Sequence, residues 1–404
     1  MITEKIAAVA AEADKELTDT YNKIDRIALL NSAKVMKAFK NNRVAESHFA
    51  ASTGYGYDDI GRSVTEKVYA DAFGTESALV RQCIVNGTHA LTVGLFGLLR
   101  PGDALLSVTG KPYDTLEDVI GISGKKNQGS LMDFGVKYRQ CEIGGNFADL
   151  LDDSVKVVYI QRSRGYGQRK ALSPDEISKI TAFVRSKSNA FVMVDNCYGE
   201  FTCENEPDAD LIVGSLIKNP GGGIALTGGY LAGTKKAVEL ASYRLTSPGV
   251  GGEVGATLGQ TRNMLLGFWL APHTVAQALK TAAFSAYVFS KFGFDVSPSY
   301  NEPRYDLIQT VTLHDPEKLK SFIRAIQYSS PVDSFVTPEP WDMPGYNDQV
   351  IMAAGTFTGG STIELSADAP MRPPYTAFMQ GALTFESGKL SVLNALSAVL
   401  NEKA

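Results

Sequence analysis

The chain has 404 residues, of which 44% are hydrophobic and 21% charged, and its formal net charge at pH 7 is -5. This length allows two or three domains with a large buried core. The small negative charge gives no basic surface of the kind that binds nucleic acid, so we expect no nucleic-acid partner. No stretch approaches the roughly 18 consecutive apolar residues of a membrane span, and the first 19 residues lack the apolar core of a signal peptide. We therefore expect a soluble cytoplasmic protein that does not bind membranes.

The cysteines and histidines give no pattern typical of a metal site or a disulfide framework. None of the four cysteines forms a C-x-x-C pair, which predicts free thiols in a reducing compartment. The four histidines are scattered, and no two of them stand one helical turn apart as zinc ligands would. We therefore expect no metal cofactor.

The first two parts of the chain are predicted to be a helical arm and a large α/β domain. Residues 1–45 form the arm, with apolar residues near helical spacing in residues 24–39. In residues 46–270, short apolar runs alternate with amphipathic segments, which indicates βα units around a mainly parallel sheet. These runs are residues 104–108, 155–160, 191–194, 211–216 and 225–231.

Residues 271–404 are predicted to form a smaller C-terminal α/β domain. A helical pattern that begins after Arg262 continues to residue 284 and leads into it. Further along, residues 307–313 and 363–365 are predicted to be extended, and residues 316–327 and 375–400 mostly helical. The fold class is therefore α/β, with a large mainly parallel-sheet domain followed by a smaller domain.

Polar residues follow several predicted strands, which is where parallel α/β sheets bind their ligands. Asp195 closes the run of residues 191–194, and Lys218 follows the run that ends at residue 217. Gly87 and Thr88 open a predicted helix after an apolar run. Tyr113 follows the strand predicted over residues 104–108 after a short turn.

Each of these positions also has a purely structural interpretation when it is taken alone. A strand-terminal aspartate often caps a helix or forms a turn, and a lysine before glycines is often a solvated loop charge. A Gly-Thr pair can serve only as a helix cap, and a tyrosine usually packs in the core or at its rim. The order and spacing of the four positions favour a shared site instead.

Together, these positions meet the requirements of pyridoxal 5′-phosphate (PLP). A lysine amine forms a Schiff base with the PLP aldehyde, and a buried carboxylate keeps the pyridine nitrogen protonated. A helix N-terminus binds the phosphate, and a flat side chain stacks on the ring. Lys218, Asp195, Gly87 with Thr88, and Tyr113 supply these groups.

The sequence resembles the fold type I PLP enzymes, which share the aspartate aminotransferase-like fold. The resemblance rests on VNGTHAL at 85–91, VMVDNCYGEF at 192–201, GSLIKNPGGGIALTGGYLAG at 214–233 and the tyrosine 25 residues after Thr88 (113 − 88). In detail it is similar to the methionine γ-lyase and cystathionine β-lyase-like family, in the branch called aluminium resistance proteins, over nearly the whole chain. The resemblance implies a carbon–sulfur lyase that acts on cystathionine, methionine or cysteine-like substrates by β- or γ-elimination.

The resemblance also implies roles for individual residues around PLP. Lys218 would carry the cofactor and shuttle protons, and Asp195 would contact the ring nitrogen. Ser215, three residues before the lysine, would help Gly87 and Thr88 to bind the phosphate, and Tyr113 would stack on the ring.

Members of the family complete the phosphate site with a Tyr-x-Arg from a neighbouring subunit. In the corresponding segment, Tyr55 and Tyr57 are present, but no arginine follows either at that spacing, and Arg62 is a candidate substitute. The resemblance thus implies a homo-oligomer, namely a dimer with shared active sites that assembles into a tetramer.

Substrate binding is expected to involve an arginine and a strand-end residue. A guanidinium pairs bidentately with a carboxylate, and Arg372 stands in a proline-rich loop of the smaller domain. It is therefore our candidate ligand of the substrate α-carboxylate. Ser163 or Arg162, just after the run of residues 155–160, is a candidate contact to the PLP ring oxygen or the substrate.

The same residues are compatible with other functions. An aminotransferase, an aldolase or a decarboxylase uses the same four anchors, because the reaction depends on which Cα bond stands perpendicular to the ring. A regulatory protein with this fold could bind PLP without turnover. The glycine-rich residues 228–235 lack the G-x-x-x-x-G-K-[ST] pattern of a phosphate loop, so a nucleotide site is not indicated.

Overall fold

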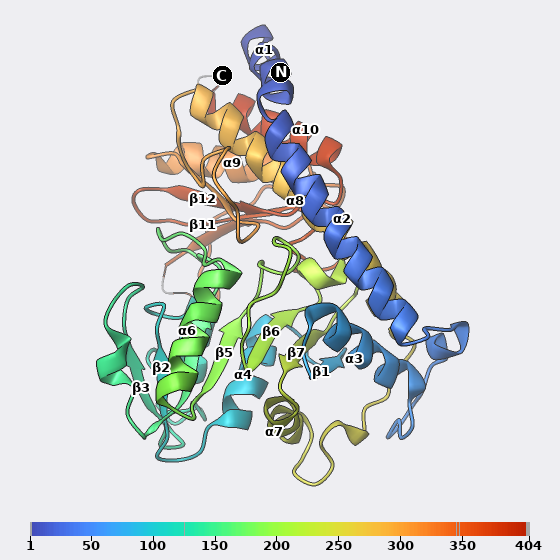
Figure 1. Ribbon diagram of the computed structural model, residues 1–404. Helices are drawn as coiled ribbons and strands as arrows, with labels where there is room; N and C mark the ends of the chain where they lie inside the picture. The colour runs from blue at the N-terminus through green and yellow to red at the C-terminus, as the bar shows by residue number, and fades with distance from the viewer. Residues whose placement is uncertain (1, 125, 345, 347, 401–404) are drawn as a thin grey trace.

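A computed structural model of the protein describes residues 2–124, 126–344, 346 and 348–400, and it contains two sheets with helices packed around them (Figure 1). The helices are α1 (Glu4–Glu16), α2 (Thr18–Asn41), α3 (Ile60–Phe73), α4 (Gly87–Leu98), α5 (Asp114–Ile120), α6 (Pro174–Lys187), α7 (Lys235–Leu245), α8 (Thr261–Lys291), α9 (Pro316–Tyr328) and α10 (Phe385–Leu400). The strands are β1 (Ser77–Arg81), β2 (Ala104–Ser107), β3 (Lys137–Gln140), β4 (Val155–Gln161), β5 (Phe191–Asp195), β6 (Leu211–Ser215), β7 (Gly229–Gly233), β8 (Asp295–Ser297), β9 (Gln309–Thr312), β10 (Val350–Ala353), β11 (Ser366–Pro370) and β12 (Thr376–Gln380).

The larger sheet is mostly parallel, as predicted. Its strand order is β1-β7-β6-β5-β4-β2-β3, and only the pairings of β7 with β1 and β6 are antiparallel. Its central strands are covered on both faces, so they are apolar throughout. In β5, for example, Val192 and Val194 join the apolar cluster on one face, whereas Met193 joins the cluster on the other.

The smaller sheet is antiparallel, with the strand order β10-β11-β12-β9-β8. Two predictions in this region are wrong. Residues 363–365 do not form a strand, since β11 begins at Ser366, and residues 376–380 are not helical but form β12. The sequence TAFMQ of β12 has no strong strand preference of its own, and it is held extended by pairing with β9 and β11.

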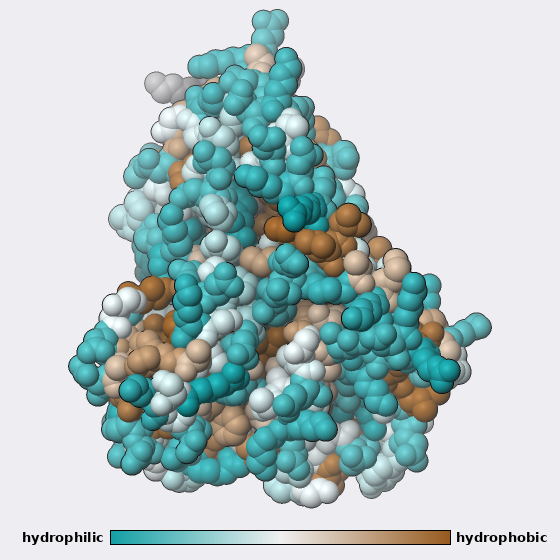
Figure 2. Space-filling model, viewed as in Figure 1, coloured by the Kyte–Doolittle hydropathy of each residue, from teal (hydrophilic) through white to brown (hydrophobic). Residues whose placement is uncertain are grey.

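The helical arm of α1 and α2 runs alongside both sheets, and α2 lies against α8 (Figure 1). Asn31 of α2 is fully buried, and its Nδ2 donates hydrogen bonds to the carbonyl oxygens of Phe201 at 3.1 Å and Cys203 at 2.9 Å. The surface is largely hydrophilic, but apolar residues are visible beside α2 (Figure 2), and Leu29 and Met36 on this helix are exposed. None of the described helices has both the length and the apolar character needed to cross a membrane.

Helix α8 joins the two sheets, and the domain boundary predicted after residue 270 falls inside it. It packs both on β9 of the smaller sheet and on the 3₁₀ turn η3 (Asn219–Gly221), which directly follows Lys218. The contact is close because both partners are glycines. A Cβ on Gly267 would overlap the carbonyl group of Gly221 and approach its carbon to 2.8 Å.

We predict that Gly267→Ala destabilises the protein by about 1–3 kcal/mol, since the added methyl group must push α8 away from η3. The measurement is urea unfolding followed by circular dichroism. Arg262→Ala, on the exposed side of the same helix, is the matched control and should change the free energy of unfolding by no more than about 0.5 kcal/mol. Equal stability of Gly267→Ala and the unmodified protein would contradict the prediction.

Candidate active site

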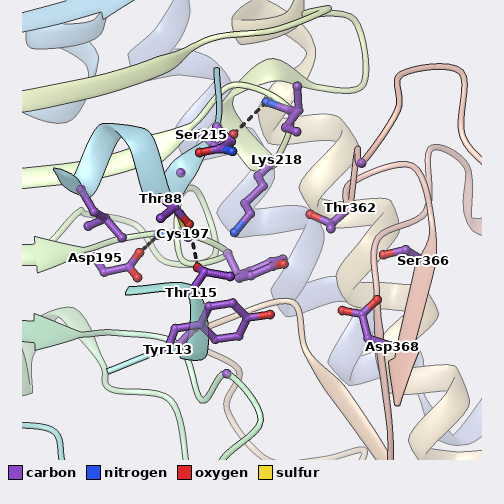
Figure 3. Close-up of a pocket in the computed structure, with 18 of the residues that line it drawn as sticks. Thr88, Tyr113, Thr115, Asp195, Cys197, Ser215, Lys218, Thr362, Ser366 and Asp368 are labelled. Atoms are coloured by element: carbon purple, nitrogen blue, oxygen red, sulfur yellow. Dashed lines mark hydrogen bonds between the residues drawn. The ribbon is translucent and has the colours of Figure 1, made fainter. Parts of the chain in front are cut away.

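A cavity of about 230 Å³ lies between the two sheets (Figure 3). Its floor is formed by residues that follow the carboxyl ends of β4, β5 and β6 and by the first turn of α4. Its opposite wall comes from the smaller domain and includes Thr362, Ser366 and Asp368. The cavity therefore opens where a parallel α/β sheet places its ligands.

Lys218 projects into this cavity from the loop between β6 and η3. The loop is fixed on both sides of the lysine, because Leu216 N–H bonds to the Gly228 carbonyl at 2.9 Å and Asn219 Nδ2 bonds to the Glu200 carbonyl at 2.9 Å. The Nζ atom lies 3.9 Å from the centre of the Tyr198 ring. Desolvation disfavours the ammonium, but the nearby acidic groups of Cys197, Tyr198 and Asp195 outweigh it and raise the pKa of Lys218.

Asp195 is the last residue of β5 and is buried, with 6% of its surface exposed. Its Oδ1 accepts a hydrogen bond from Cys197 N–H at 3.1 Å, and its Oδ2 accepts one from the Tyr159 hydroxyl at 3.3 Å. Burial raises the pKa of Asp195, whereas Lys218 and the Cys197 N–H act in the opposite direction. A buried carboxylate fixed in this way can receive an N–H donor from a ligand ring.

The N-terminus of α4 provides a site for an anion. The Asn86 side chain caps the helix by accepting from His89 N–H at 2.8 Å, and the first-turn N–H groups that α4 cannot satisfy lie at the cavity. Gly87 leaves space there, since a Cβ at this position would lie 3.1 Å from Cys197 Sγ and 3.9 Å from Lys218 Nζ. Any side chain at residue 87 would fill the gap between the helix end and the lysine.

The remaining predicted cofactor ligands also line the cavity. Ser215, fully buried at the end of β6, accepts from Ile217 N–H at 3.3 Å. Thr88 Oγ1 lies 2.7 Å from Thr115 Oγ1. Tyr113 precedes α5, and its hydroxyl lies 2.8 Å from that of Tyr346.

Of the two alternatives after β4, the cavity includes Ser163 but not Arg162. Arg162 is fully buried elsewhere, because its guanidinium pairs with Glu206 at 2.8 Å and donates to Asn196 Oδ1 at 2.7 Å. Its surroundings are those of a structural arginine.

Arg372, Tyr55 and Tyr57 are not brought to the cavity by this single chain. Arg372 is 49% exposed and pairs with Asp348 at 2.6 Å, beside neighbouring hollows that Tyr166 also lines. Tyr55 and Tyr57 are exposed and stack on each other with ring centres 5.5 Å apart. Their predicted contacts with ligands stay predictions.

Arg62, the candidate substitute for the missing phosphate arginine, has partners of its own. Its guanidinium donates to the carbonyl oxygens of Gly56 at 2.6 Å, Gly255 at 3.0 Å and Glu253 at 3.0 Å. It therefore holds the turn that carries the two tyrosines. It does not line the cavity.

Among the cavity residues that were not identified from the sequence are Cys197, Tyr198, Tyr346 and Asp368. Cys197 and Tyr198 directly follow Asp195, so their position after the strand was a usable signal. Asp368 is a charged residue inside a strand of small residues, SADAP, which also marks it as unusual. Tyr346 carries no signal of this kind, since only the tertiary fold brings it to Tyr113.

The residues of this cavity fit PLP. Lys218 would hold the aldehyde carbon, Asp195 the ring nitrogen, and the α4 N-terminus with Ser215 the phosphate. A phosphate bound beside the lysine needs free space between Lys218 and the N-terminus of α4. Gly87 leaves this space open, because a Cβ at residue 87 would fill it.

Comparison with known proteins also indicates a PLP-dependent enzyme. A family model described as methionine gamma-lyase matches residues 6–400. The uncharacterized protein YnbB of Bacillus subtilis (strain 168) is 47% identical over 99% of this chain and 98% of its own length. The structure of a carbon–sulfur lyase involved in aluminium resistance from Clostridium novyi NT is 49% identical, covers 98% of this chain and 96% of its own, and has a TM-score of 0.94.

A more distant structure shows the fold alone. The PLP-dependent protein YhfS from Escherichia coli is 15% identical and superposes with a TM-score of 0.63 over 94% of this chain and 97% of its own. The predicted fold type I architecture and the predicted cofactor are thus confirmed. The chain belongs to the methionine gamma-lyase family of PLP-dependent enzymes.

Proposed function

We propose that the protein is a carbon–sulfur lyase that acts on sulfur amino acids such as cystathionine, methionine or cysteine by β- or γ-elimination. The observation that carries this proposal is the placement of the Lys218 amine in one cavity with buried Asp195 and the N-terminus of α4. The similarity to the carbon–sulfur lyase of Clostridium novyi NT over nearly the whole chain supports the reaction class.

PLP, when bound, withdraws electrons from the substrate Cα and so makes its proton acidic. Lys218 is the only lysine or arginine among the described residues that line the cavity, and we assign to its Nζ the transfer of that proton. The Asp195 carboxylate would accept a hydrogen bond from the ring N–H and keep that proton in place. Tyr113 would orient the ring by packing on its face.

The proposed elimination moves protons through Lys218 and breaks one carbon–sulfur bond. In β-elimination, the Cα proton passes to Lys218 Nζ and the carbon–sulfur bond breaks with its electrons on sulfur. In γ-elimination, Lys218 Nζ also removes a Cβ proton before that bond breaks. In both cases the thiolate takes up a proton and leaves as a thiol. Water then hydrolyses the released enamine to a 2-oxo acid and ammonia. An aminotransferase would instead return an amino acid without releasing a thiol.

Product analysis tests the reaction. Incubation of the holoenzyme with cystathionine, methionine or cysteine should release a thiol or sulfide and a 2-oxo acid in equal amounts, measured with a thiol reagent and by derivatisation of the 2-oxo acid. Transfer of the amino group without thiol release would contradict the proposed lyase. A protein that retains PLP but converts none of these substrates would favour a binding role.

The lysine assignment is tested without relying on activity. After borohydride reduction, mass spectrometry should find pyridoxyl phosphate fixed to Lys218 in the unmodified protein and no fixed cofactor in Lys218→Ala, because the amine that bonds the aldehyde is gone. Lys235→Ala, at an exposed position at the start of α7, is the control and should keep the full modification. Cofactor fixed to another lysine in the Lys218→Ala variant would overturn the assignment.

We further propose that Tyr55 and Tyr57 act in the active site of a second copy, within a dimer or tetramer. Two observations support this proposal: both tyrosines are exposed, and the hydrogen bond from Arg62 to the Gly56 carbonyl fixes the turn that contains them. Neither Lys218→Ala nor the double variant Tyr55→Ala/Tyr57→Ala should be active alone. An equimolar mixture of the two, in which about half of the dimers are mixed, should regain roughly a quarter of the activity, because one of the two sites in each mixed dimer is then intact. No recovery in verified mixed dimers would show that the tyrosines act within their own chain or not at all.

A further inference from the structure

The cavity contains a second carboxylate that the proposed elimination does not use. Asp368 lies on β11 of the smaller domain, across the cavity from Asp195, with Lys218 and Tyr113 between them (Figure 3). It is buried, with 7% of its surface exposed.

The hydrogen bonds of Asp368 are incomplete. Oδ2 accepts from Gln380 Nε2 at 3.2 Å, whereas Oδ1 is buried and has no hydrogen-bond partner among the described residues. The Tyr166 hydroxyl lies close enough to the carboxylate to lower the pKa of Asp368, although it does not reach full hydrogen-bond geometry. A buried carboxylate oxygen without a donor is unfavourable, so this arrangement points to a donor that arrives with the ligand.

Asp368 keeps a negative charge under ordinary conditions. Burial raises its pKa to about 6, against the lowering effects of Gln380 and Lys218. At neutral pH or above, the ionised form therefore dominates. An anionic group placed beside it would be repelled, and a cationic group would be attracted.

Aromatic rings surround this end of the cavity. The ring centres of Tyr113 and Tyr346, which line the cavity, are 6.1 Å apart. Tyr166 does not line the cavity but packs behind these rings, 5.6 Å from Tyr113 and 5.9 Å from Tyr346. Tyrosine rings together with a carboxylate are the usual surroundings of a bound organic cation. No described residue that lines the cavity is an arginine that could bind an acidic side chain instead.

We propose that Asp368 is a specificity residue that binds an ammonium group at the far end of the substrate side chain, on the part that leaves as the thiol. This inference rests on the proposed carbon–sulfur lyase function. The substrate α-amine cannot be this partner, because its place is at PLP beside Lys218. The favoured substrates are thus thioether amino acids whose leaving group carries an amine.

Two matched substrates test the proposal. S-(2-aminoethyl)-L-cysteine ends in an ammonium group, and S-propyl-L-cysteine has a methyl group at the same place. The unmodified holoenzyme should prefer the first in kcat/KM by tenfold or more, as expected for a hydrogen bond between charged groups. Asp368→Asn should reduce this preference at least tenfold, whereas Asp295→Asn, on an exposed carboxylate of the smaller domain, should preserve it.

A binding measurement separates this proposal from the proposed reaction. L-Lysine and L-2-aminoheptanoate have the same shapes as the two substrates but no sulfur to eliminate, and their dissociation constants can be read from the visible absorbance of bound PLP. Tighter binding of L-lysine that depends on Asp368 would support the specificity role even if no thioether were cleaved.

Two results would overturn the proposal. In the first, the unmodified enzyme shows no preference for S-(2-aminoethyl)-L-cysteine in kcat/KM and none for L-lysine in binding. This result does not depend on whether a variant folds. The other is an Asp368→Asn variant with normal PLP content that loses activity on both substrates equally and keeps the binding preference. Asp368 would then act on the reaction itself and not on substrate choice.

Discussion

The placement of Lys218 and Asp195 at one edge of the sheet is the constraint on which the rest of the site depends. Asp195 is buried and Lys218 faces a confined cavity, and a charge removed from water is costly unless an opposite charge or a donor lies nearby. The parallel strands β5 and β6 are adjacent and end on the same side of the sheet, so Asp195 and the loop that carries Lys218 lie close together and the two opposite charges can compensate each other. The close contact between Gly221 and Gly267 then fixes the loop that carries the lysine.

The sequence was sufficient to predict the half of the site that belongs to the large domain. Lys218, Asp195, Gly87 and Thr88 each follow an apolar run, and the ends of parallel strands converge by a rule that needs no knowledge of the tertiary structure. Tyr113 was found by its distance from Thr88 in a family pattern. All five residues line the same cavity.

The other half of the site could not be predicted in this way. Asp368 and Tyr346 come from the smaller domain, whose strands are short and are held by pairing and not by a clear alternation of apolar and polar residues. Which loop of that domain faces the lysine depends on how α8 docks the two sheets together. Arg372 illustrates the difficulty, since its loop was recognised but its side chain pairs with Asp348 outside the cavity.

The continuity of α8 has a mechanical consequence for the cavity. Because one helix packs on the loop after Lys218 and on the smaller sheet, the two walls of the cavity cannot separate without bending it. Pro272 lies within α8, and a proline has no N–H to bond to the preceding turn. α8 therefore lacks one backbone hydrogen bond at Pro272, and bending the helix there breaks fewer bonds than bending it elsewhere.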